Sequence, residues 1–163
     1  DTGAVDAIGI AAAPASLVQQ YVDTDAFDAV LCHNRFTLVD QTARALFEDA
    51  KSRGMTVFNA APFGAGLLAK GSASGARYGY REVPDDLRRW VQAAEEVCAS
   101  NGVSLRAAAL HFSLRSPLVD STVVGVSSAS RLAELDELAA TPVPDDVWGA
   151  LEDLGPAPSN VDA

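Results

Sequence analysis

The sequence predicts an α/β fold in which parallel strands alternate with helices in a single domain of residues 1–163. Three observations lead to this prediction. Short runs that are apolar at nearly every position recur along the chain, as is typical of strands buried on both faces of a parallel sheet. Segments with helical apolar periodicity separate these runs, as crossovers between parallel strands require. No linker rich in Pro, Ser or like charges divides the chain, and 48% hydrophobic residues suffice for one core.

The first part of the chain contains three of these apolar runs. Residues 7–11, 29–32 and 55–58 are each expected to form a short strand. A helix is expected to begin at Pro14 and to follow the first strand. A second helix follows Asp40 and ends near Gly54, where glycine is a common helix terminator.

The second part of the chain begins with a break in this rhythm. Residues 64–83 are rich in Gly, Ser and Ala, which predicts a long surface loop of the kind that often carries function or forms a lid. Helices are then expected over residues 84–101 and 104–116, followed by a fourth strand over residues 122–126. A further helix follows that strand, and a last short helix is expected over residues 145–154.

Four strand–helix units amount to half of a (β/α)8 barrel, whose complete chain runs to about 250 residues. A lone four-stranded sheet of the flavodoxin type is the alternative arrangement. A half barrel leaves two apolar edge strands unpaired, and such edges normally need to be covered.

Charge and cysteine content argue against several classes of function. The 12 Lys and Arg residues against 22 Asp and Glu give a net charge of −10, which does not suit nucleic acid or anionic membranes as partners. Cys32 and Cys98 have neither zinc-site spacing nor the number needed for a disulfide framework, so we expect no metal site and two reduced, half-buried thiols in a cytoplasmic protein. No apolar run approaches the ~18 residues of a membrane span.

The junction between the fourth strand and the next helix is the strongest candidate site. Gly125 lies near the end of the apolar run, Ser127 and Ser128 lead directly into the helix, and Arg131 lies in its first turn. Backbone N–H groups at a helix N-terminus bind anions, and phosphate sites in (β/α)8 barrels cluster after the last two strands. The two serines could equally be ordinary helix caps.

Two other strand ends could contribute to the same site. Pro62, Phe63 and Gly64 follow the third strand and could form the wall of a pyrophosphate site, or simply a structural glycine-rich turn. His33 ends the second strand, where it could line the mouth of a barrel or serve as a structural histidine.

The long loop carries Tyr78 and Tyr80 beside Arg77 and Arg81. Tyrosine rings stack on sugars and arginines pair with phosphate, so this loop could close over a substrate or cofactor. The alternative is a solvated loop without a binding role.

Several segments, in order along nearly the whole chain, resemble the C-terminal half of an aldo-keto reductase. Residues 7–10 resemble the family's fifth strand, and residues 35–38 resemble the segment after its sixth strand. Residues 54–68 resemble the seventh strand with its loop. Residues 99–110 also match the family, and residues 123–132 resemble the region of its eighth strand. The run Tyr78-Gly79-Tyr80-Arg81 is similar to the sugar-oxidising branch, the L-fucose and D-threo-aldose 1-dehydrogenases.

This resemblance implies strands five to eight of a (β/α)8 TIM barrel. It also implies hydride transfer between NADP or NAD and a small carbonyl or sugar substrate. The family's Asp/Tyr/Lys/His tetrad belongs to the first half of the barrel, so no catalytic residue is expected in this chain and the chain alone is expected to be inactive. The expected partner is the missing N-terminal half-barrel or a second copy of this chain.

The resemblance also implies roles in cofactor binding. Arg131 matches an arginine near the adenosine phosphate and Glu134 a glutamate that contacts adenine, whereas Gly125 and Leu135 replace a lysine and an asparagine of the family. NADP and NAD therefore both remain open. Two other functions stay as alternatives, a non-catalytic nucleotide-binding or regulatory barrel module and a structural half-barrel that self-associates.

Overall fold

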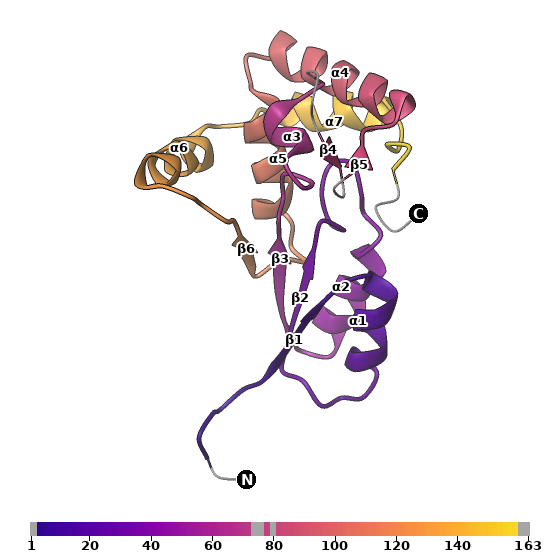
Figure 1. Ribbon diagram of the computed structural model, residues 1–163, viewed down its shortest axis with the longest axis vertical. Coiled ribbons are helices and arrows are strands. Elements are labelled where there is room, and N and C mark those ends of the chain that lie inside the picture. Colours follow the sequence, from indigo (N-terminus) through magenta and orange to yellow (C-terminus); the bar gives the residue numbers. More distant parts are fainter. Residues whose placement is uncertain (1–2, 73–76, 79–80, 160–163) are drawn as a thin grey trace.

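The computed structural model describes residues 3–72, 77–78 and 81–159, and its main feature is one parallel sheet (Figure 1). The strands, in sheet order, are β1 (Gly9–Ala12), β2 (Ala29–His33), β3 (Thr56–Ala60) and β6 (Ser121–Val123). In the strand register, His33 pairs with Ala60, and Ala60 pairs with Val123, at the carboxyl end of the sheet. The predicted α/β fold with parallel strands and intervening helices is confirmed.

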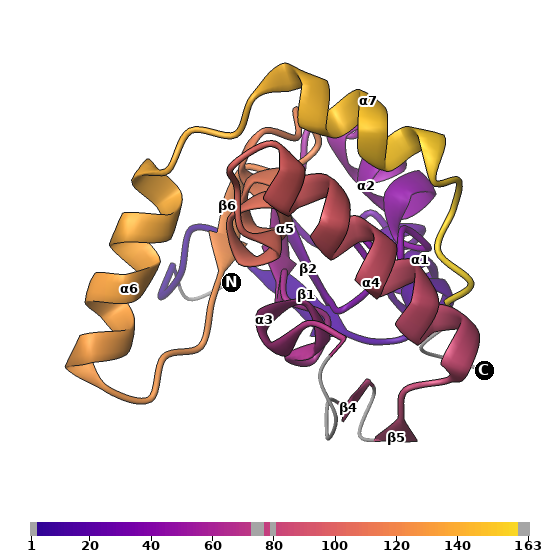
Figure 2. The same ribbon diagram turned by 90° about the horizontal axis from the view of Figure 1, so that it is seen from above.

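Most of the helices belong to one of two groups, one that packs on the sheet and one that lies farther from it. The elements are α1 (Ala15–Val22), α2 (Arg44–Ser52), α3 (Leu67–Lys70), α4 (Asp85–Ser100), α5 (Leu105–Leu114), α6 (Ala129–Ala140) and α7 (Asp145–Asp153). The helices α1, α2 and α5 pack on the sheet, whereas α4 and α7 lie together at the end opposite the N-terminus (Figures 1 and 2).

Two apolar clusters form the core. One lies between the sheet and the first two helices, where Val30 and Val57 of the strands meet Val18 and Phe47. The other joins α3, α4, α5 and α7. The helical spacing of apolar residues dictates both clusters, because it places them on the one face of each helix that is buried.

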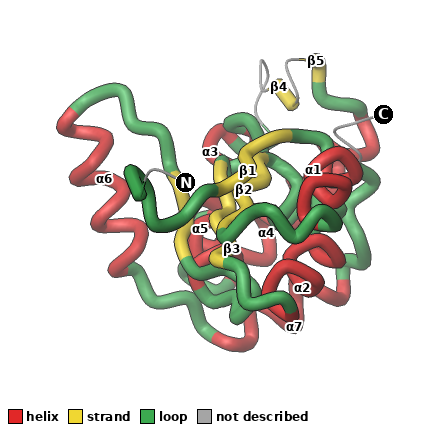
Figure 3. Tube along the Cα trace, turned by 90° about the horizontal axis from the view of Figure 1, so that it is seen from below, coloured by secondary structure: helices red, strands yellow, loops and turns green. Residues whose placement is uncertain are grey.

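The opposite face of the sheet is not covered in the same way. Along β2, Val30 and Cys32 are fully buried, whereas the alternate residues Ala29, Leu31 and His33 are partly exposed. No residue of the two outer strands, β1 and β6, is fully buried, and no residue of α6 is buried. Figure 3 shows α6 at the outer side of the molecule, away from the strands, where it contacts α5. The chain thus leaves two sheet edges and one sheet face open, as a half barrel would.

The structure corrects the prediction of a surface loop over residues 64–83. Leu67 and Leu68 of α3 are completely buried, and Tyr78 is only 6% exposed. Tyr78 belongs to a short antiparallel hairpin, β4 (Arg77–Tyr78) with β5 (Arg81–Glu82). Because the segment is rich in glycine, its sequence did not indicate that these three side chains are buried. Residues 73–76 and 79–80 lie outside the described part, so the lid role stays a prediction.

Two smaller predictions were also wrong. The fourth strand ends at Val123, not at residue 126, because β3 ends at Ala60 and offers no further pairing partner. Cys32 and Cys98 are fully buried rather than half-buried, since both lie on the apolar faces that form the two clusters.

Candidate functional site

A cavity of about 280 Å³ lies where the loops after β3 and β6 meet the start of α5. Pro62 and Phe63 line it from the first loop, and Gly125 and Arg131 line it from the second. The carboxyl ends of neighbouring parallel strands meet at one edge of the sheet, which is where ligands bind in such folds. Four of the residues predicted from sequence therefore come together in one cavity.

The loop after β3 reaches this cavity through a tight turn. Ala61, Gly64, Ala65 and Gly66 all have positive φ, of 57°, 54°, 53° and 93°. The Asn34 side-chain oxygen accepts a hydrogen bond of 2.8 Å from the backbone N–H of Ala65, which ties this loop to the end of β2. The turn is thereby fixed with Phe63 facing the cavity.

Gly64, a predicted cofactor contact, points away from this cavity. A Cβ atom at Gly64 would lie 3.4 Å from Cγ2 of Val39 and 3.6 Å from the ring of Tyr78. Its left-handed φ also favours glycine. The glycine therefore packs against the core in this structure, which fits the structural interpretation of the turn.

The second loop leads into α6 through a helix cap. Ser128 has extended φ and ψ, and its Oγ accepts the N–H of Arg131 at 3.3 Å, as an N-cap residue does. Among the described residues, the backbone N–H groups of Ala129 and Ser130 have no protein acceptor. Ser127 is exposed and lies outside the cavity lining. The helix start thus offers two N–H groups to an anion.

Arg106 is a cavity residue that sequence reasoning missed. It lies near the start of α5 and lines the same cavity as Arg131. Its Nε is buried and has no hydrogen-bond partner, while its Nη2 lies 3.4 Å from Oε2 of Glu134. Glu134, predicted to contact adenine, is thus placed at the cavity through its ion pair with Arg106 rather than in the lining itself. A single arginine before three alanines was the only signal in the sequence.

The charged side chains that line this cavity are positive, opposite in sign to the net charge of the whole chain. Arg106 and Arg131 are the only charged side chains among the described residues that line it, and the rest of the lining is apolar or backbone. The complete chain carries a net charge of −10. Two guanidinium groups and an open helix N-terminus suit a phosphate or carboxylate ligand.

The remaining predicted residues lie elsewhere. His33 ends β2 on the open face of the sheet, and its carbonyl accepts a hydrogen bond of 2.9 Å from Nη1 of Arg35. The Tyr78 hydroxyl donates to Oδ2 of Asp40 at 3.2 Å and accepts from Oγ of Ser159 at 2.7 Å. Burial raises the pKa of Tyr78 well above its ordinary value, and the negative charge of Asp40 raises it further by a smaller amount.

This position makes Tyr78 a core residue in the structure, and its predicted contact with substrate has no support from its surroundings. Neither His33 nor Tyr78 lines the cavity. Tyr80 lies outside the described residues. The roles of His33 and Tyr80 therefore stay predictions.

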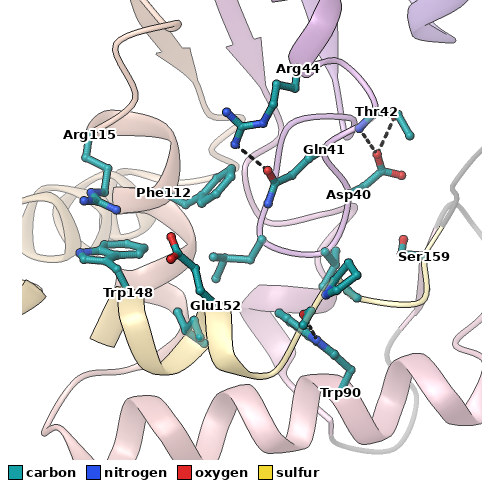
Figure 4. A pocket seen from close by; sticks show the side chains of 16 residues that line it. Asp40, Gln41, Thr42, Arg44, Trp90, Phe112, Arg115, Trp148, Glu152 and Ser159 are labelled. Carbon is teal, nitrogen blue, oxygen red and sulfur yellow. Dashed lines mark hydrogen bonds between the residues drawn. The ribbon is translucent and has the colours of Figure 1, made fainter. Parts of the chain in front are cut away.

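A larger cavity of about 580 Å³ lies between α4, α5, α7 and the loop after β2 (Figure 4). Two of its lining side chains already have partners, since Trp90 Nε1 donates to the Gly155 carbonyl at 3.0 Å and the Arg115 guanidinium lies 4.3 Å from the centre of the Trp148 ring. None of the predicted site residues lines it. It lies away from the open strand ends, so size alone does not make it the functional site.

Two kinds of feature are absent from the described residues. They contain no group of three or more His, Cys, Asp or Glu side chains placed to hold a metal ion. They also contain no helix that combines the length and apolar character needed to cross a membrane.

Comparisons with known proteins agree with this architecture. The model of the aldo/keto reductase family matches residues 1–156. The chain is 33% identical over 151 residues to the D-threo-aldose 1-dehydrogenase of a Pseudomonas species, which covers 91% of this chain and 46% of that protein. It is 25% identical over 154 residues to the pyridoxal 4-dehydrogenase of Microbacterium luteolum, covering 94% of this chain and 45% of the relative. The chain thus spans about half the length of the curated relatives it matches.

Solved structures give the same result for the fold. The aldo-keto reductase AKR11C1 of Bacillus halodurans, in its holo form, superimposes with a TM-score of 0.69 and 19% identity over 91% of this chain and 50% of that one. Its apo form gives a TM-score of 0.68. The fold therefore matches about half of an aldo-keto reductase barrel. Family model, relatives and fold together confirm the predicted resemblance, and the chain belongs to the aldo/keto reductase family.

Proposed function

We propose that this chain is the C-terminal, cofactor-binding half of an NAD(P)-dependent oxidoreductase. The reaction would transfer a hydride between the nicotinamide and a carbonyl or alcohol carbon of a sugar or another small substrate. The names of the relatives support this class, since they denote dehydrogenases of D-threo-aldose, pyridoxal and L-galactose. The sugar dehydrogenases among them favour an aldose as the substrate.

The observation that carries the proposal is the cationic cavity at the carboxyl ends of β3 and β6. Its lining contains two guanidinium groups, of Arg106 and Arg131, and guanidinium groups are common phosphate ligands. Arg131 and the first N–H groups of α6 would hold the phosphate of the adenosine end, and Phe63 with Pro62 would form an apolar wall. When bound, the nicotinamide end supplies the hydride donor or acceptor.

This chain would position the cofactor rather than move the proton of the reaction. We place no catalytic residue in it, because the family's acid–base tetrad belongs to the other half of the barrel. The N-terminal half of the barrel would then supply that tetrad, either as a preceding segment of the same polypeptide or as a partner chain. Support comes from the open edges at β1 and β6, where Ile8 and Val123 are 49% and 41% exposed.

Binding and turnover can be tested separately. NADPH is titrated into the purified chain while its fluorescence is followed, and oxidation of L-fucose and D-threo-aldoses with NADP⁺ and NAD⁺ is assayed with the same sample. We expect saturable binding that Arg131→Gln weakens and that Arg89→Gln, on the exposed surface of α4, does not. We expect no turnover by the chain alone, and measurable aldose oxidation by it would overturn the proposal.

A structural half-barrel that pairs with itself is the second candidate. The same exposed edges favour it, because two copies could cover each other's open sheet face. Sedimentation of the 16.9 kDa chain as a dimer without any nucleotide affinity would support this candidate over the first. Tight nucleotide binding without turnover, after the barrel is completed with an N-terminal half, would instead support a regulatory module.

A further inference from the structure

We propose that the larger cavity, of about 580 Å³ between α4, α5, α7 and the loop after β2, binds a small aromatic carboxylate. Its volume lies in the range of about 300–1,000 Å³ that small-molecule sites have. This site goes beyond the proposed function, because the cavity shares no lining residue with the proposed cofactor cavity. Either assignment can therefore fail without the other.

Aromatic rings from three helices form much of the apolar wall of this cavity. Trp90 of α4, Phe112 of α5 and Trp148 of α7 line it. The Trp90 ring is held by the hydrogen bond from its Nε1 to the Gly155 carbonyl. The Phe112 ring packs against the Phe36 ring, with 5.2 Å between their centres, and Trp148 is only 8% exposed. Rings held in this way favour a flat aromatic ligand, which can stack on one ring and meet another edge-on.

The polar side chains at one end of the cavity have more hydrogen-bond donors than acceptors. Nη2 of Arg44 donates to Oε1 of Gln41 at 2.7 Å. The amide nitrogen of Gln41 and the other guanidinium N–H groups of Arg44 have no acceptor among the described residues. In that part of the chain the Arg115 guanidinium also has no hydrogen-bond acceptor, only its contact with the Trp148 ring. Figure 4 shows Arg44, Phe112 and Arg115 toward the same end of the cavity. A carboxylate suits this end, because it accepts hydrogen bonds from guanidinium and amide donors.

The two acidic side chains of the lining do not remove this preference for an anion. Asp40 is 3% exposed, and its carboxylate already accepts hydrogen bonds from Thr42 and from the Tyr78 hydroxyl. Glu152 is exposed and forms no ion pair with any described residue. Two arginines against this one available carboxylate favour an anionic ligand over an amine. Glu152 would then weaken binding of the ligand, so its substitution tests the sign of the ligand's charge.

The test uses 4-phenylbutyrate as the probe, with 4-phenylbutanol and 4-phenylbutylamine as its neutral and cationic counterparts. Trp90 and Trp148 are the two tryptophans of the chain, so tryptophan emission reports directly on this cavity during a titration. We expect 4-phenylbutyrate to shift that emission saturably and to bind at least about fivefold more tightly than the alcohol or the amine, as charged hydrogen bonds would provide. The saturated analogue 4-cyclohexylbutyrate should bind at least about twofold more weakly, because it cannot stack as an aromatic ring does.

Two variants test the charges of the site, with thermal unfolding as the check that each variant is folded. Arg44→Gln should weaken binding of 4-phenylbutyrate by about threefold to tenfold, and Glu152→Gln should strengthen it by about twofold. Two controls should leave the affinity unchanged, Arg89→Gln on the exposed surface of α4 and Arg131→Gln in the cofactor cavity.

Several results would overturn the assignment of this cavity. They are failure of the folded chain to bind 4-phenylbutyrate, binding of the amine or of the cyclohexyl acid that is equally tight, and an affinity that falls with Glu152→Gln. A loss of affinity with Arg131→Gln as large as that with Arg44→Gln would place the probe in the cofactor cavity and would also overturn it.

Discussion

Replacing Asn59 with leucine should destabilise the fold by about 2–4 kcal/mol, although the two side chains are similar in size. Asn59 is completely buried in β3, and its Nδ2 donates to the Phe36 carbonyl and to Oγ of Ser113, both at 2.8 Å. These bonds join the strand to the loop after β2 and to α5. The side chain therefore holds three parts of the core together.

The magnitude follows from what each bonding partner loses. Two buried hydrogen bonds contribute about 1 kcal/mol each, and an unpaired carbonyl at Phe36 costs about 1–3 kcal/mol more. Ser113 keeps a second partner, since its Oγ lies 2.7 Å from Oγ1 of Thr122. Leucine also removes Oδ1 of Asn59, which is buried without a partner, and this offsets about 1 kcal/mol of the lost unfolding free energy.

Thermal and urea unfolding of the two proteins would measure the difference. For a chain of 163 residues the predicted loss corresponds to a Tm lowered by about 4–16 °C. Asn101→Leu is the matched control, because Asn101 is exposed at the end of α4 and its substitution should change stability by less than about 0.5 kcal/mol. An Asn59→Leu protein as stable as its parent would refute the assignment of these bonds to the core.

Three further predictions concern a carboxylate, a phenol and a helix cap. Hydrogen bonds from Lys51 and, to a smaller extent, from the N–H of Val57 lower the pKa of Asp120. These bonds therefore stabilise the folded state above about pH 4, and this contribution is lost as the pH falls. The difference in unfolding free energy between parent and Asp120→Asn, measured by urea unfolding, should shrink over the same pH range. The raised pKa of Tyr78 has the opposite sign, so Tyr78→Phe should cost about 1–2 kcal/mol at neutral pH and progressively less above about pH 10 in the same assay. Ser128→Ala should destabilise α6 by about 1 kcal/mol, seen as faster hydrogen exchange of α6 amides with no change in the strands.

The order of strands and helices was predictable because the chain repeats one local pattern. Val30 and Val57 lie in short apolar runs that only a sheet covered by helices can bury, and both are 0% exposed. The ends of the elements were less predictable, since they depend on pairing partners. The strand at Val123 stops where its neighbour stops, which is a tertiary effect.

The candidate site was predictable in part for the same reason. Pro62, Phe63, Gly125 and Arg131 follow strands, and strand order alone brings their loops together. Arg106 lies on a helix outside its apolar face, where an arginine ordinarily means a solvated position. Only the packing of α5 against α6 turns that position into a cavity wall, and no pattern within α5 encodes it.

The small number of contacts that α6 makes has a consequence for how nucleotide binding and assembly of the barrel depend on each other. Because no residue of α6 is buried, little holds the backbone that presents Arg131 except neighbouring α5 and the ion pair of Arg106 with Glu134. A helix anchored so lightly opens by local unfolding far more readily than the strands do. A polypeptide segment that packs against α6 would therefore also hold Arg131 in place for the proposed phosphate contact. Assembly of the barrel and binding of the nucleotide would then each make the other more favourable.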